Sequence, residues 1–191
     1  MDFVFDLLQG TGIAAAIGIR PFLPVLLTGA LASADLGVDF DGTSFAFLEA
    51  PGFLLGVLVA VALTYVGERR LGQPRVEPWM LPIAVALGLF VAAGSLADND
   101  HPVIPGMVAG ALAAQLGFFA ARSLFGRVRR RLDADAQGAL PVYGEGAALL
   151  AAGASILFPP LAILVLVALA WLLAGGRRRA GEKYAGLRIL R

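Results

Sequence analysis

Three long apolar stretches constrain this chain more than any other feature. They cover residues 51–67, 79–96 and 103–125, and a helix needs roughly 20 apolar residues to cross the hydrocarbon core of a bilayer. Only 15% of the 191 residues are charged, whereas a soluble domain usually carries about 25%. We therefore expect an all-α polytopic membrane protein. An outer-membrane barrel would instead show segments of about ten residues with alternating polarity.

Two further apolar regions, residues 1–32 and 143–174, are interrupted by glycine and proline. As one straight helix, each would be about 48 Å long, which exceeds a hydrocarbon core of roughly 30 Å. We predict that each region forms two short helices in a re-entrant or half-depth hairpin, each half being too short to span comfortably. The predicted turn residues are Gly18, Pro21 and Pro24 in the first region, and Gly153, Pro159 and Pro160 in the second. The alternative is five single spans, the first and last long and tilted.

The distribution of charge predicts the topology. Basic clusters follow the first and third stretches and end the chain, whereas residues 33–50 and 98–100 carry only acidic charges. The positive-inside rule places the basic clusters in the cytoplasm. The prediction is one transmembrane domain over residues 1–176 and a basic cytoplasmic tail over residues 177–191, in a bacterial inner membrane. Five single spans would instead place the C-terminal cluster outside.

The two interrupted regions also resemble each other. Residues 10–12 align with residues 144–146, and residues 18–24 align with residues 153–159, with three glycines and one proline in common. One predicted hairpin enters from each side, which is the arrangement of an inverted repeat. Paired segments of this kind indicate a transport site near the membrane midplane.

Four polar residues in or beside these regions are the candidate substrate ligands: Arg20, Glu68, Glu145 and Ser155. Arg20 lies among apolar residues. A charge is costly in that setting, so such a residue either pairs with another polar group or forms part of a functional site. Its guanidinium could bind a phosphate or carboxylate in bidentate fashion, or it could satisfy carbonyls freed by the prolines. Glu145 is either a proton carrier or counter-charge, or a helix-start acid. Glu68 is either part of the site or an interfacial ion pair, and Ser155 could simply form an interhelical hydrogen bond.

Other features narrow the function. The basic run Arg127, Arg129, Arg130 and Arg131 is expected to contact anionic lipid headgroups, and nucleic acid is an improbable partner beside a membrane span. Without cysteine and with a single histidine, His101, the chain offers no Cys or His metal site. No nucleophile–base set and no cofactor motif appears, so we expect no enzyme and no cofactor, with an intramembrane enzyme as the open alternative.

Around Arg20 the chain contains a Gly-x-Arg-x-Phe-x-Pro stretch over residues 18–24. With Glu68, Pro141 and Glu145, this stretch resembles a family of small bacterial inner-membrane proteins of unknown function. The resemblance covers most of the chain and supports these residues as important, but it implies no activity. This sequence has Gly-Glu-Gly at residues 144–146, where the family leads us to expect an acidic pair. The two-hairpin layout also looks like that of bacterial polyprenyl-phosphate recycling proteins, as an analogy of fold alone.

These observations lead to one expected function and two alternatives. The expected function is a small transporter or lipid flippase for an anionic substrate, with a site at mid-membrane and a homodimer as a plausible assembly. The alternatives are an oligomeric anion channel, in which Arg20 lines the pore, and a membrane scaffold that transports nothing.

Overall fold

The computed structural model describes residues 3–71, 73–133 and 137–185, and of residues 71, 73–75 and 177–185 it describes the backbone only. The described part of the chain is helical and contains no strand. In chain order the elements are α1 (Phe3–Ile19), α2 (Phe22–Ala32), the short 3-10 helix η1 (Ala46–Leu48), α3 (Pro51–Leu71), α4 (Gln73–Ala97), α5 (Val103–Arg129), α7 (Leu140–Leu157) and α8 (Leu161–Ala185).

Four of the described helices have the length and apolar composition to cross a membrane, which makes the chain a membrane protein. Three of them, α3, α4 and α5, contain the stretches expected to span. The fourth is α7, with 18 residues, so the expectation that each half of the last apolar region is too short to cross is wrong for its first half. The reason is that Gly144, Gly146 and Gly153 do not interrupt the helix, because glycine, unlike proline, keeps its backbone N–H donor.

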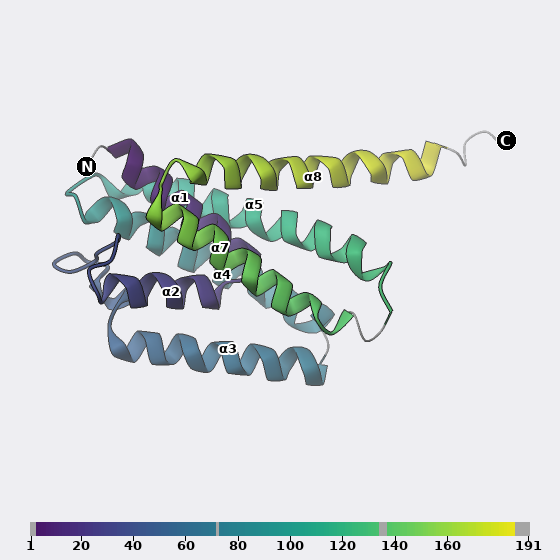
Figure 1. Cartoon of the computed structure of the whole chain (residues 1–191), viewed down its shortest axis with the longest axis horizontal. Coiled ribbons are helices and arrows are strands. Elements are labelled where there is room, and N and C mark those ends of the chain that lie inside the picture. The colour runs from purple at the N-terminus through teal and green to yellow at the C-terminus, as the bar shows by residue number, and fades with distance from the viewer. Residues whose placement is uncertain (1–2, 72, 134–136, 186–191) are drawn as a thin grey trace.

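The first apolar region divides where proline requires it. Helix α1 ends at Ile19 and α2 begins at Phe22, since Pro21 has no N–H to continue the hydrogen-bond ladder. A single tilted helix over residues 1–32 is therefore wrong. At 1.5 Å per residue, the 11 residues of α2 rise about 16 Å, roughly half the rise of α3. Figure 1 shows α2 beside α3, beginning partway along it.

Helix α1 is the core of the bundle. Every residue from Gln9 to Gly18 is buried, because α1 packs against α4, α5, α7 and α8. A helix that is apolar all round suits such a position. Small residues allow the close approach, as is common between membrane helices: a side chain at Gly18 would collide with the backbone of Ala114 on α5. By contrast, only 6% of the spanning window of α3 is buried, so α3 offers its apolar surface to the surroundings.

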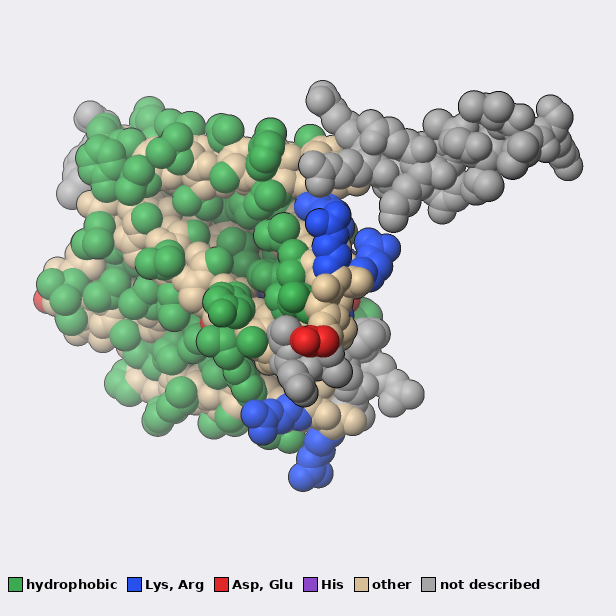
Figure 2. Space-filling view, turned by 45° about the vertical axis from the view of Figure 1, so that its right-hand side comes forward, with side chains coloured by type: hydrophobic (Ala, Val, Ile, Leu, Met, Phe, Trp, Pro, Cys, Tyr) green, Lys and Arg blue, Asp and Glu red, His purple; other side chains and the backbone are tan. Residues whose placement is uncertain are grey.

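The two ends of the bundle carry opposite charge. The α3–α4 and α5–α7 connections lie at one end, together with the described end of α8, and residues 33–50 and 98–102 lie at the other (Figure 1). Figure 2 shows that the arginine side chains visible on this face gather at the first end. We call these the basic end and the acidic end. Much of the basic tail predicted for residues 177–191 continues α8 as far as Ala185, and residues 186–191 lie outside the described part.

Candidate substrate-binding site

Arg20 lies in the turn between α1 and α2 and contacts two acidic side chains from distant parts of the chain. Its Nη1 donates a hydrogen bond to Oε1 of Glu68, at 2.6 Å, near the end of α3. Its Nε lies 3.7 Å from Oε1 of Glu145, near the start of α7. The three side chains are between 12% and 20% exposed. The turn, α3 and α7 therefore meet at one largely buried ionic cluster, which we call the Arg20 triad.

The Arg20 triad contains one guanidinium and two carboxyl groups. With both carboxyls ionised, its charge would be −1. Oε2 of Glu145 is also buried and has no hydrogen-bond partner within the described part of the chain. A buried charge without compensation is costly, so a proton on one carboxyl or a bound cation would stabilise the cluster. The triad can therefore exchange a proton or a counter-ion.

A cavity of about 210 Å³ opens beside the triad. Its charged lining combines three arginines with two glutamates: Arg20, Glu68, Glu77, Arg122 and Arg129. Its apolar wall includes Met80, Phe118 and Phe125. A second ion pair forms part of the lining, where Nε of Arg122 lies 2.9 Å from Oε1 of Glu77. The cavity is thus amphipathic, with cationic groups and aromatic surface facing the same space.

The structure brings three of the four candidate ligands together. Arg20, Glu68 and Glu145 form the triad. Within the described part of the chain, the Arg20 side chain donates its hydrogen bond to Glu68 and not to a carbonyl freed by proline. Ser155 is elsewhere: its hydroxyl donates to the carbonyl of Ala151 in its own helix. Ser155 is therefore not part of the Arg20 site, and the prediction that it acts as a ligand there is wrong.

The two proline-containing turns also lie apart. Arg20 is level with Gly144, at the start of α7, whereas the turn after Leu157 emerges at the acidic end (Figure 1). There the side-chain nitrogen of Gln9 donates a hydrogen bond to the carbonyl of Ile156. The turns at Pro24 and Pro159 therefore do not meet at one site, as the predicted inverted repeat would require, because α7 crosses the bundle completely whereas α2 reaches only partway.

Four polar contacts in the described part of the chain were not predicted from the sequence. Glu77 lines the cavity with Arg122. A glutamate near the start of an apolar span could have been recognised as a candidate from the sequence.

The other contacts lie at the acidic end, where Nε2 of His101 lies 3.5 Å from Oδ2 of Asp6. Gln9 joins α1 to two other segments through the carbonyls of Gly37 and Ile156. Residues in these pairs lie 28 or more positions apart in the chain, so spacing gave no signal.

The basic run lies at the end of α5 and borders a second cavity of about 310 Å³ between α5 and α8. Arg127 and Arg131 line it together with Trp171. Arg127 donates to Oγ of Ser123 at 2.5 Å, and Arg130 donates to the carbonyl of Gly126. Arginine beside tryptophan at the end of a span is typical of the membrane interface.

Comparisons with protein-family models, with curated proteins and with solved structures find no significant match to this chain. The resemblance at residues 18–24 therefore stays an expectation, and the function has to be argued from the site itself.

Proposed function

We propose that this chain is a small membrane transporter or flippase for an amphiphile with an anionic, phosphate- or carboxylate-bearing head. The observation that carries the proposal is the amphipathic cavity beside the Arg20 triad, where a buried guanidinium already paired with two acids faces apolar surface. Arginine presents a planar fork of donors that matches phosphate and carboxylate.

The chemistry of the proposed site is an exchange of counter-ions. A substrate anion would displace Glu145 from Arg20 more easily than Glu68, because the contact with Glu145 is 3.7 Å and that with Glu68 is 2.6 Å. The released carboxyl group would then take up a proton, because an isolated carboxylate is costly in this setting. Substrate binding would thereby be coupled to protonation, with little change in the net charge of the site.

The size and lining of the cavity favour an amphiphile over a wholly polar substrate. At about 210 Å³, it is smaller than the roughly 300–1,000 Å³ that usually encloses a drug-sized ligand. It suits a headgroup, and the apolar part of the substrate would remain in the bilayer or against Phe118 and Phe125. In this proposal α1 and α2 form a half-depth hairpin entered from the acidic end, which places Arg20 deep within the bundle.

The orientation belongs to the same proposal. The positive-inside rule would place the basic end in the cytoplasm and the acidic end outside a bacterial inner membrane. Arg127 and Arg131 would then contact anionic lipid headgroups at the cytoplasmic surface. The proposal does not depend on an inverted repeat, because Arg20, Glu68 and Glu145 form the site without the turn at Pro159.

A second candidate function is a scaffold that transports nothing. The observation in its favour is that Arg20 already has a short ion pair with Glu68, which would serve as a structural connection between the α1–α2 turn and α3. An oligomeric anion channel is the third possibility. A channel would conduct anions without saturation, which distinguishes it from a transporter and from a scaffold.

A flippase assay with purified protein tests the proposal. Vesicles with fluorescent NBD-labelled phosphatidylglycerol are exposed to dithionite, which bleaches only the outer leaflet, and NBD-labelled phosphatidylcholine is the zwitterionic control. We expect bleaching beyond the outer leaflet for the anionic lipid, reduced in Arg20→Lys and unchanged in Arg70→Gln, an exposed arginine of the same basic end. Non-saturable chloride conductance would favour the channel, and no flux of lipid, phosphate or chloride would favour the scaffold.

A further inference from the structure

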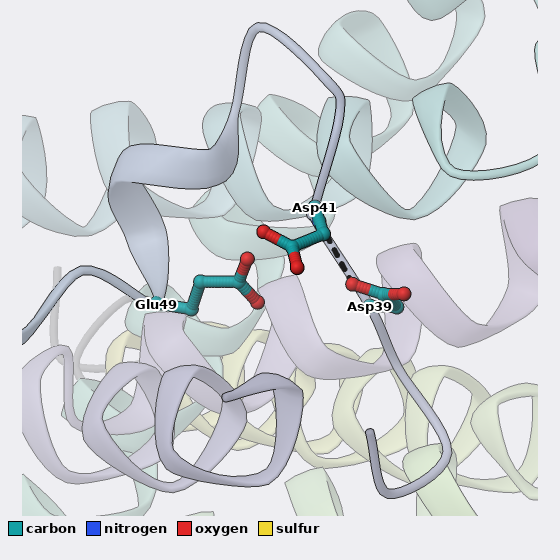
Figure 3. A group of neighbouring side chains, drawn as sticks. All are labelled: Asp39, Asp41 and Glu49. Carbon is teal, nitrogen blue, oxygen red and sulfur yellow. Dashed lines mark hydrogen bonds between the residues drawn. The ribbon is translucent and has the colours of Figure 1, made fainter. Parts of the chain in front are cut away.

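The acidic end carries a compact group of three carboxylates. Asp39, Asp41 and Glu49 lie in the segment between α2 and α3, and one carboxylate oxygen from each lies within 4.8 Å of the others. In Figure 3 the side chains of Asp41 and Glu49 point toward each other, and Asp39 receives a hydrogen bond from the backbone N–H of Asp41. We call these three residues the acidic group.

Buried neighbours hold the acidic group in place. Asp39 and Asp41 flank Phe40, which is fully buried and packs against Gly94 of α4. Glu49 follows Leu48, which is 1% exposed, and the carbonyl of Leu48 lies against Gly29 of α2. The backbone at all three positions is therefore anchored to the bundle, which keeps the three residues close together.

The charge of the group is not compensated locally. Residues 33–50 contain no lysine or arginine. Glu49 is 9% exposed, and its Oε2 is buried with no hydrogen-bond partner among the described residues. A buried carboxylate oxygen without a donor is costly, and a ligand for a cation is expected to have such an oxygen.

We propose that Asp39, Asp41 and Glu49 bind a divalent cation of the calcium class at the acidic end of the bundle. Calcium takes six to eight oxygen ligands at about 2.3–2.6 Å, so two ligands of one ion lie at most about 5 Å apart. The oxygens of the acidic group meet this limit as they stand. Magnesium binds at about 2.0–2.1 Å, demands near-ideal octahedral geometry and gives up its water reluctantly, so we expect it to bind this group less tightly than calcium.

The cation would connect the two halves of the segment. Asp39 and Asp41 precede η1 and Glu49 follows it, so one ion would join the chain leaving α2 to the chain entering α3. With three protein carboxylates and the remaining positions filled by water or carbonyl groups, we expect a Kd of about 0.1–1 mM, as in extracellular calcium modules.

Calcium binding to the full chain in detergent tests the proposal. The protein is dialysed against EGTA, and its melting temperature is measured with 10 mM CaCl2, with 10 mM MgCl2 and with NaCl of equal ionic strength. We expect calcium to raise the melting temperature by roughly 3–10 °C and magnesium to raise it less. Asp41→Asn and Glu49→Gln should lose most of this shift. Asp35→Asn should keep it, because Asp35 lies in the same segment but outside the acidic group.

Titration calorimetry gives a second measurement that does not depend on the stability of the Glu49 variant. Asp41 is exposed, so Asp41→Asn is expected to fold, and it should weaken calcium binding at least tenfold. The proposal is overturned if the unmodified chain shows no calcium heat and no thermal shift. It is equally overturned if Asp35→Asn loses as much calcium affinity as Asp41→Asn, which would indicate diffuse attraction to a negative surface.

Discussion

Arg20 and Glu68 are 48 residues apart in the chain, yet Nη1 of Arg20 lies 2.6 Å from Oε1 of Glu68. The pair joins the α1–α2 turn to the last turns of α3, a helix that is otherwise largely unburied. Glu145 approaches the same guanidinium from α7. The turn that proline creates is thus held between two helices by charge, and the stability and the proposed activity of the chain both depend on this contact.

The triad predicts unequal effects of neutralising its two acids. Glu68→Gln should lower the free energy of unfolding by roughly 1.5–3 kcal/mol, because it removes the charge-assisted hydrogen bond to Arg20 and leaves only the longer contact with Glu145. Glu145→Gln should cost less, because its contact is 3.7 Å. The double variant should cost more than the sum, since each acid partly replaces the other. Thermal unfolding in detergent measures this, and strictly additive losses would contradict the triad.

Arg20→Lys separates the charge of Arg20 from its shape. Lysine keeps the positive charge but not the planar fork, so the variant should fold and retain a melting temperature close to that of the unmodified chain. Lipid flipping should fall about tenfold or more, since hydrogen bonds to charged groups contribute about 1.5–3 kcal/mol. Arg20→Ala should lose activity and also stability. Full activity in Arg20→Lys would show that bidentate binding of an anion is wrong.

Close helix packing gives a prediction independent of the site. A methyl group at Gly110 on α5 would lie 2.5 Å from the carbonyl oxygen of Gly88 on α4. Gly110→Ala should therefore destabilise the bundle by about 1–3 kcal/mol, as overpacking does. Gly56→Ala is the matched control, because nothing lies within 4 Å of that position, and alanine favours a helix over glycine by about 1 kcal/mol. Equal effects at the two positions would contradict the α4–α5 packing.

The sequence was sufficient for the features that depend on local chemistry. Apolar length predicted the helices α3, α4 and α5, and the missing N–H of Pro21 predicted the division between α1 and α2. Pro159 and Pro160 likewise predicted the turn between α7 and α8. The prediction failed for the length of α7, because Gly144, Gly146 and Gly153 do not interrupt this helix. Glycine keeps its backbone N–H donor and can therefore stay helical, and at Gly144 its small size also permits the contact with Phe125.

The candidate site was predictable only in part, for a different reason. An arginine among apolar residues signals a charged site, but the sequence does not state which acids lie near it. Glu68 and Glu145 were candidates from their positions at the ends of apolar stretches. Glu77 and the acidic group depend on how separate segments pack, and in the acidic group it is the buried anchors Phe40 and Leu48 that hold the carboxylates together.

The proposed topology can be tested directly, because the chain contains no cysteine. Ser44→Cys places a thiol on an exposed residue of the acidic end, and Ala139→Cys places one on an exposed residue of the basic end. In spheroplasts, a membrane-impermeant maleimide should label the Ser44→Cys variant while the cells are intact. It should label the Ala139→Cys variant only after lysis. Labelling of both variants in intact spheroplasts, or the reverse order, would contradict the proposed orientation.

The acidic group predicts a dependence of stability on pH that calcium should reverse. Burial, together with the hydrogen bond and charge of Asp41, raises the pKa of Glu49 above its usual value of 4.5, and the charge of Asp39 adds to this effect. The folded state therefore binds a proton at Glu49 more tightly than the unfolded state does. Without calcium, the contribution of Glu49 to stability should be greatest below pH 4.5 and should decline as the pH rises through the raised pKa.

Burial also raises the pKa of Asp98, so the measurement has to be the difference in melting temperature between the unmodified chain and Glu49→Gln at each pH. In EGTA, this difference should turn against the unmodified chain as the pH rises from 4.5 to 7, since only the glutamate becomes a buried anion. With 10 mM CaCl2 the sign should invert at pH 7, because the cation stabilises the ionised carboxylate and glutamine offers a weaker ligand. A difference that does not change with pH in either condition would show that Glu49 does not titrate in the folded chain.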